Sequence, residues 1–220
     1  MHRIPEPDLM DNAEQARAYA EADFSEAHDA FVAHFKSRFP TFNKGNVLDL
    51  GCGTADVIIR FAQAFPQSYI TGIDGAQAML DIGLCDIDKK GCGDQINLQK
   101  CILPDHALQS SSFDAVISNS LLHHLLNPQI IWDTINCCAA QGAPVFIMDL
   151  MRPDSTERAK KLVHLYAGDA SPVLQKDFFN SLLAAYKTDE IISQLKTAGL
   201  NYLTVEVVSD RHALVWGTKR

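Results

Sequence analysis

The sequence predicts an α/β fold, a doubly wound and mostly parallel seven-stranded sheet with helices on both faces and a C-terminal antiparallel hairpin. From residue 46 onward, short apolar runs alternate with amphipathic segments of helical length, which is typical of parallel strands joined by crossover helices. Gly51 and Gly53 follow the first of these runs, at the edge where such sheets bind ligands. Near the C-terminus, residues 209–211 separate two further apolar runs, which predicts the hairpin.

Each element is expected from its own local pattern. Extra N-terminal helices are predicted, the first capped by Asp11 or Asn12 and ending at Tyr19, the second running from Ser25 to Phe39. Strands are expected at 47–50, 68–73, 96–103, 113–118, 144–150, 202–208 and 212–216. Core helices are expected at 55–65, 76–89 and 128–139, and a helical insert before the hairpin at 154–167, 172–186 and 188–198.

A single domain over residues 1–220 is expected, because no repeat, low-complexity segment or Gly/Ser-rich linker divides the chain. Its parts are a helical cover (1–43), a ligand-binding core (46–150), a helical lid region (153–198) and a closing hairpin (200–217).

Charge and hydropathy restrict the partners. The chain has 19 Lys and Arg against 27 Asp and Glu, a formal net charge of −8, so its surface repels phosphate backbones and a nucleic-acid partner is not expected. No apolar run approaches the ~18–20 residues that cross a bilayer, and the N-terminus has no apolar leader. We therefore expect a cytoplasmic protein without a membrane partner.

The six cysteines contain no Cys-x-x-Cys pair, and reduced thiols are expected. Cys85, Cys92 and Cys101 are irregularly spaced, with no histidine at ligand periodicity. The sequence therefore predicts no metal site.

The segment from Val47 to Asp56 carries the strongest ligand signal. Its two glycines allow a sharp turn and a close backbone approach, and Asp74 ends the next strand, where a carboxylate accepts hydrogen bonds from ribose hydroxyls. Both a dinucleotide and S-adenosylmethionine contain a ribose that such a loop and carboxylate can bind. Asp56 occupies the sixth position of the Gly-x-Gly-x-x-Gly/Ala pattern, close to a pyrophosphate, whereas Asp49 is placed to contact an ammonium group. This charge pattern favours the cationic ligand.

Over residues 46–150 the sequence resembles the class I S-adenosylmethionine-dependent methyltransferase family. The resemblance rests on VLDLGCGTAD, ITGIDGAQAML, SFDAVISNSLLHHLLNP and GAPVFIMDLMRP, in this order. It implies S-adenosyl-L-methionine as cofactor and S-adenosylhomocysteine as product. The cofactor-binding residues expected are Asp49, Gly51, Gly53, Asp74, Gly75, Met79, Ile102, Leu103, Asn119 and Ser120.

One position departs from the family. Members often carry an acid after the third strand that binds the adenine amino group, but Lys100-Cys-Ile-Leu-Pro-Asp105 has none there. Backbone groups of Ile102 or Leu103, or Asp105 from the loop, are the alternatives for this contact.

Methyl transfer needs an acceptor aligned with the methyl carbon, and a general base only where the acceptor is protonated. The catalytic candidates are His123, Asn119 and Tyr19. His123 and His124 are not expected to face the pocket together, so His123 either orients or deprotonates the acceptor, or both histidines cap and pack the following helix. Asp149 and Arg152 either hold the acceptor or pair with each other.

The acceptor pocket is expected under the N-terminal helices and the helical insert. Its candidate lining residues are Tyr19, Phe24, His28, Tyr166, Phe178, Phe179 and Tyr186. The acidic stretch 18–29 is either a solvated helix face or an attraction for a basic amine.

These patterns predict methyl transfer to a small-molecule substrate. Alternatives are an RNA or protein methyltransferase, although Asn119-Ser-Leu-Leu122 lacks the Asn-Pro-Pro-Tyr-type motif of many enzymes that methylate nucleic-acid amino groups, and a non-catalytic cofactor-binding partner subunit. A homodimer is a further hypothesis.

Overall fold

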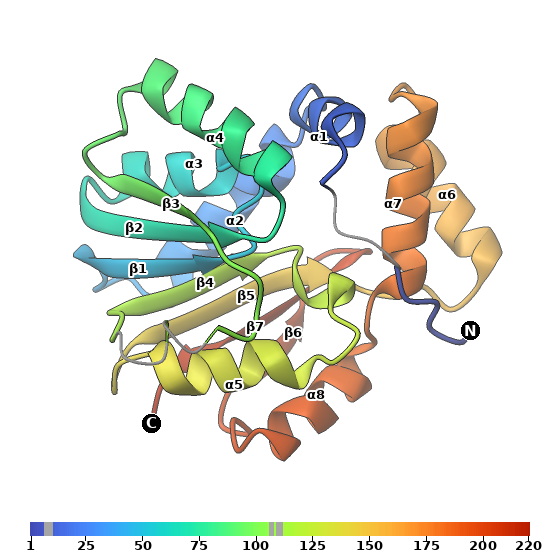
Figure 1. Ribbon diagram of the computed structural model, residues 1–220. Coiled ribbons are helices and arrows are strands. Elements are labelled where there is room, and N and C mark those ends of the chain that lie inside the picture. The colour runs from blue at the N-terminus through green and yellow to red at the C-terminus, as the bar shows by residue number, and fades with distance from the viewer. Residues whose placement is uncertain (7–10, 106–107, 109–111) are drawn as a thin grey trace.

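A seven-stranded sheet forms the centre of the protein (Figure 1). The computed structural model describes residues 1–6, 11–105, 108 and 112–220. The strands follow the order β3-β2-β1-β4-β5-β7-β6, and β7 runs antiparallel to both of its neighbours while the remaining neighbours pair in parallel. Their bounds are β1 Lys44–Leu50, β2 Gln67–Asp74, β3 Ile96–Lys100, β4 Ala115–Asn119, β5 Pro144–Leu150, β6 Thr204–Val207 and β7 His212–Thr218. The predicted fold class is confirmed.

Helices cover both faces of this sheet, as Figure 1 shows. Their bounds are α1 Ala13–Ala20, α2 Ser25–Arg38, α3 Asp56–Ala64, α4 Gln77–Lys90, α5 Gln129–Cys138, α6 Thr156–Ala167, α7 Pro172–Ala184 and α8 Thr188–Thr197, with a 3₁₀ turn, η2, at Leu122–His124. The pleat of β1 separates the two cores, because Val47 packs in a cluster with α2 and α3 while Leu48 packs with α5 and α8.

Aromatic rings fill the core between α2 and the sheet. Phe35 is fully buried, and its ring centroid lies 4.9 Å from that of Phe61 on α3 and 5.5 Å from that of Phe146 on β5. Both pairs meet edge to face, an arrangement that stabilises aromatic contacts beyond simple burial. The second predicted helix thus belongs to the core and holds the N-terminal region against the sheet.

Most strands differ from the prediction at one or both ends. β1 begins at Lys44 instead of residue 47, β2 is one residue longer at each end, β6 is shorter at both ends, and β7 continues to Thr218 instead of residue 216. Two further differences change the elements that flank the site. β3 ends at Lys100 instead of residue 103, because Lys100 pairs with Asp74, the last residue of β2. β4 begins at Ala115 instead of residue 113, and Phe113 forms only an isolated bridge to Ala139. The end of β3 follows from the length of β2, which the local apolar pattern does not contain.

Three helices gather beyond the carboxyl ends of the parallel strands. These are α1, α6 and α7, which lie together in Figure 1. α1 contacts α7 and also α4, and α6 packs against α7. None of the helices in the described ranges is long and apolar enough to span a membrane. The arrangement places the N-terminal helix and the helical insert over the edge that carries the glycine loop.

Candidate active site

The glycine loop joins β1 to α3 and needs its glycines for two different reasons. Gly51 has φ +74° and Gly53 has φ +52°, a left-handed region that disfavours residues with a Cβ. A Cβ on Gly51 would lie 2.9 Å from Cβ of Leu121, whereas one on Gly53 would meet no atom of the described residues within 4 Å. Gly51 is therefore required by packing, and Gly53 leaves open space beside the backbone.

Asp74 holds this loop in place. Its Oδ2 accepts a hydrogen bond from the backbone N of Gly53 at 2.8 Å, and its Oδ1 accepts one from the backbone N of Ala76 at 2.8 Å. A carboxylate oxygen has two lone pairs, so both oxygens keep capacity for a further donor such as a hydroxyl.

Asp49 is a buried carboxyl group at the end of β1. Its side chain is 2 % exposed, and among the described residues no group hydrogen-bonds to its Oδ1. Burial and the nearby charge of Asp74 raise the pKa of Asp49 to about 8. A buried carboxyl next to a ligand loop, with one oxygen that has no partner among the described residues, fits a cationic or hydrogen-bond-donating group.

A cavity of about 1170 Å³ opens at this edge of the sheet. Its size exceeds the range of about 300–1,000 Å³ of a pocket for one small ligand. Of the predicted site residues, the cavity is lined by Tyr19, Gly51, Gly53, Asp74, Met79, Asn119, Ser120 and His123. The structure therefore brings most of the predicted cofactor and catalytic residues to one cavity.

The end of β4 contributes two groups with unusual features. Oδ1 of Asn119 is buried and has no hydrogen-bond partner among the described residues. Ser120 has φ +61°, a strained conformation for a residue with a side chain. Such strain persists where the surrounding structure holds it, often at ligand sites.

Four predicted cofactor residues are not among the residues that line the cavity: Asp49, Gly75, Ile102 and Leu103. Ile102 is 62 % exposed, and Leu103 packs against the core on the α5 side. The thiol of Cys101 donates a hydrogen bond to Oδ2 of Asp105. The adenine contact thus stays a prediction for Ile102, Leu103 and Asp105.

His123 makes a buried pair with Asp149. Nδ1 of His123 lies 2.6 Å from Oδ1 of Asp149, whose Oδ2 accepts a hydrogen bond from the backbone N of Leu122. Burial disfavours the imidazolium, but the charge and hydrogen bond of Asp149 outweigh it and raise the pKa of His123. This pairing fixes the orientation of the ring.

The expectation that only one of the two histidines faces the pocket is wrong. His123 and His124 both line the cavity, and their ring centroids lie 4.1 Å apart. A helix would turn neighbouring side chains apart, but η2 is a single tight turn that ends at His124.

Of the two alternatives for Asp149 and Arg152, the mutual pair does not form. Arg152 instead donates hydrogen bonds to Oε1 of Glu190 and to the backbone O of Ala185. The carboxylate of Asp149 pairs with His123 and accepts hydrogen bonds from backbone N–H groups. Neither residue is among those that line the cavity.

Tyr19 lies where the N-terminal helix meets the cofactor side of the cavity. It packs in an apolar cluster with Ala76 and Met79 of the α4 start. Burial, followed by the charges of Asp56 and Asp74, raises the pKa of Tyr19 to about 12, so its hydroxyl stays protonated at neutral pH. Asp56 is paired with His28 and Arg60, which lower its pKa to about 2.

Some of the other residues predicted to line the acceptor pocket do so, and some do not. Phe24, His28, Tyr166 and Phe178 line the cavity, whereas Phe179 and Tyr186 are not among its lining residues. The predictions missed several lining residues, namely Glu6, Met148, Leu150, His164, Leu174, Asp177, Ser181, Arg211 and His212. Most lie on α6, α7 and the β6–β7 connection, for which no motif exists in the sequence.

Glu21, Asp23 and Glu26 are also among the residues that line the cavity. All three are exposed, so the solvated helix face and the attraction of a basic amine both stay open for the acidic stretch 18–29. The only Lys or Arg among the described lining residues is Arg211, which makes the cavity poorly suited to anions.

Comparison with known proteins agrees with this geometry. Residues 47–144 match a family model described as a methyltransferase domain. Among curated proteins, the chain is 31% identical to trans-aconitate 2-methyltransferase of Deinococcus radiodurans over 46% of this chain and 36% of that protein. It is 28% identical to demethylmenaquinone methyltransferase of Porphyromonas gingivalis over 60% of this chain and 54% of that protein.

Among solved structures, the plantazolicin methyltransferase BpumL in complex with SAH superposes with a TM-score of 0.75. It is 15% identical over 94% of this chain and 90% of that one, a similarity that shows the shared fold. The chain spans between about a fifth and about half of the length of the first curated relatives that it matches. Residues 47–144 therefore form a methyltransferase domain, and the sheet order and the motifs of the ligand loop agree with the resemblance to the class I S-adenosylmethionine-dependent methyltransferase family.

Proposed function

We propose that this protein transfers the methyl group of S-adenosylmethionine to a small-molecule acceptor and releases S-adenosylhomocysteine. The observation that carries the proposal is one cavity of about 1170 Å³ that runs from Gly53 and Asp74 to Asn119 and His123. Its volume has room for a cofactor and an acceptor together. The curated relatives named for trans-aconitate and demethylmenaquinone support an acceptor of small size.

The residues present fit the cofactor. Asp74 offers a carboxylate for the ribose hydroxyls, and Gly53 leaves open backbone where a ligand approaches. The unpartnered carboxyl of Asp49 suits an ammonium group, directly or through water. When bound, S-adenosylmethionine supplies a methyl group that its sulfonium charge already activates.

The remaining residues orient the acceptor and exclude water. Asn119, whose Oδ1 is buried without a partner among the described residues, ends β4, and His123 lies on η2. Both line the cavity, where an acceptor can be positioned. α1, α6 and α7 contribute the side chains that cover the cavity. The acidic lining by Glu21, Asp23 and Glu26 favours an uncharged or cationic acceptor over an anionic one.

The test is methyl transfer from S-adenosylmethionine labelled in its methyl group, with a small-molecule extract and the macromolecular fraction of a lysate offered separately. Label in a product of low molecular mass is the expected result, and Asp74→Ala should abolish most of it. Label that only nuclease or protease releases would instead indicate an RNA or protein acceptor. Tight S-adenosylhomocysteine binding without transfer to either fraction would support the non-catalytic subunit.

A further inference from the structure

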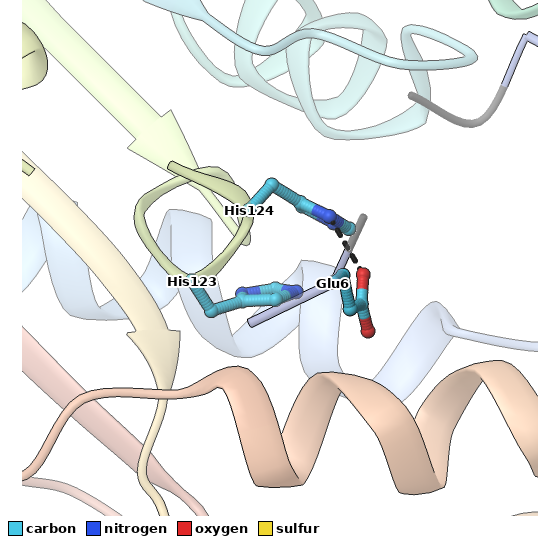
Figure 2. A group of neighbouring side chains, drawn as sticks. All are labelled: Glu6, His123 and His124. Atoms are coloured by element: carbon cyan, nitrogen blue, oxygen red, sulfur yellow. Dashed lines mark ion pairs between the residues drawn. The ribbon is translucent and has the colours of Figure 1, made fainter. Parts of the chain in front are cut away.

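Three metal-ligating side chains meet at the acceptor end of the cavity. Glu6 comes from the N-terminal segment, and His123 and His124 come from η2, more than a hundred residues away. One ligand atom from each residue can be chosen so that all lie within 4.8 Å of one another. Figure 2 shows both imidazole rings directed toward the Glu6 carboxylate.

His123 is already arranged as a metal ligand. Its Nδ1 is occupied by the hydrogen bond to Asp149 at 2.6 Å, which leaves Nε2 as the coordinating atom. A carboxylate that holds the second nitrogen of a ligating histidine is a recurrent feature of metal sites, because it fixes the ring and its tautomer.

Glu6 is held in position from two sides. Its Oε1 accepts a hydrogen bond from Oγ of Ser181 at 2.8 Å, and its Oε2 lies 2.9 Å from Nδ1 of His124. Arg3 fastens the same segment to the histidine turn, since its Nη2 donates to the backbone O of His123 and of Leu125. The N-terminal segment is therefore built to bring a carboxylate to the two histidines.

We propose that Glu6, His123 and His124 bind a divalent first-row transition metal ion, for which Zn²⁺ is the probe. Two imidazoles and one carboxylate form a ligand set for such ions, whereas Mg²⁺ and Ca²⁺ prefer oxygen ligands alone. Ligands about 2.0–2.2 Å from a tetrahedral ion are ~3.4 Å apart. Oε2 of Glu6 and Nδ1 of His124, now 2.9 Å apart, therefore separate slightly to admit the ion, whereas ligand atoms that lie up to 4.8 Å apart move closer. All three line the cavity, so a position remains open on that side for water or for an acceptor oxygen.

This site goes beyond the proposed methyl transfer, and its existence is tested without any turnover. Protein dialysed against a chelator is titrated with Zn²⁺ by calorimetry and with Co²⁺ by visible absorption, which reports tetrahedral or five-coordinate nitrogen and oxygen ligands. We expect one ion per chain, a Co²⁺ band without thiolate charge transfer, and affinity at least 10-fold lower in Glu6→Gln and in His124→Ala. Asp149→Asn should weaken binding by ~10–100-fold, because the carboxylate that orients the His123 ring is lost.

His164→Ala is the matched control, because His164 lines the same cavity but is exposed and outside the cluster. It should keep the metal affinity of the parent. S-Adenosylhomocysteine affinity, measured on each variant, shows that the protein is folded. Unchanged metal affinity in Glu6→Gln and His124→Ala, or no binding to a protein that binds S-adenosylhomocysteine, would overturn the metal site and leave the proposed function standing.

Discussion

The 2.6 Å contact between Nδ1 of His123 and Oδ1 of Asp149 joins the turn after β4 to the end of β5 at the acceptor side of the cavity. Both side chains are nearly removed from solvent, at 3% and 4% exposure. Asp149 also accepts hydrogen bonds from the backbone N of Leu122 and of Leu150, so its carboxylate organises the whole turn. A buried carboxylate with several donors is costly to disturb.

Asp149→Asn is expected to lower the free energy of unfolding by about 2–3 kcal/mol, because a charged hydrogen bond is lost in a buried place. The loss depends on pH. The folded-state pKa of His123 is raised, so the stability from its charged pair is fully present below pH about 6.5 and disappears as the pH rises through the raised value. Urea unfolding of both proteins between pH 5.5 and 9 should show a difference that narrows toward high pH.

Asp56→Asn is a matched control for this effect. His28 and Asp56 also form a 2.6 Å pair, but the Asp56 side chain is 42% exposed. Solvent screening should keep its loss near 1 kcal/mol or below. A difference for Asp149→Asn that stays constant across the pH range would contradict the charged-pair explanation.

Asp74→Ala is expected to weaken S-adenosylhomocysteine binding by ~10–100-fold. Hydrogen bonds to a charged group contribute about 1.5–3 kcal/mol, and the change also releases the backbone N–H of Gly53 from its anchor. Isothermal titration calorimetry measures the affinity, with Asp81→Ala on the exposed side of α4 as the control. Equal affinities for the two variants would remove Asp74 from the ribose site.

Substitution of the two loop glycines should have different effects: Gly51→Ala mainly lowers stability, and Gly53→Ala mainly weakens ligand binding. Gly51→Ala combines a left-handed backbone with a 2.9 Å clash against Leu121, and is expected to cost about 2–4 kcal/mol of unfolding free energy. The Gly53→Ala methyl group meets no neighbour in the described part of the chain, so only the backbone strain of about 1–2 kcal/mol applies. Its methyl group would occupy the open space on the cavity side and reduce S-adenosylhomocysteine affinity at least 10-fold.

Thermal unfolding measures the stability of both variants, and calorimetry measures their affinity for S-adenosylhomocysteine. A Gly53→Ala protein that binds S-adenosylhomocysteine as tightly as the parent would show that the ligand does not approach this stretch of backbone.

The core of the fold was predictable because its signals are local. Each parallel strand carries an apolar run, and Gly51, Gly53 and Asp74 follow strands whose carboxyl ends share one edge. Strand ends were less predictable: β3 stops at Lys100 because its partner β2 stops at Asp74, and that limit is a property of pairing.

The acceptor side depends on contacts between distant segments. Nothing in the sequence around Glu6 indicates that it reaches His124, since the contact requires α7 and the anchored Arg3 to bring the N-terminal segment to η2. In the same way, Asp149 and Arg152 are near in sequence, yet each has a better partner elsewhere, His123 and Glu190 respectively. Their positions in the sequence predicted that both residues lie near the end of β5, but not which residues they pair with.

Asp49→Asn should have opposite effects on stability and on binding. The folded-state pKa of Asp49 is raised to about 8 by burial and by Asp74, so the stability that depends on its neutral form is fully present below pH about 4 and lost as the pH rises through 8. Asn has the same shape and stays neutral, so the variant should lose less stability than the parent toward pH 9. Without the charge that attracts an ammonium group, its S-adenosylhomocysteine affinity at pH 8.5 should be ~10-fold lower.

Urea unfolding from pH 5 to 9 and calorimetry at pH 8.5 measure the two effects, with the exposed Asp94→Asn as the control that should change neither. A purely structural Asp49 would produce the gain in stability with unchanged binding. If the variant gains stability at high pH and also binds S-adenosylhomocysteine more weakly, the buried carboxyl contacts the amino group of the ligand. The loss of one negative charge then explains both the change in stability and the change in affinity.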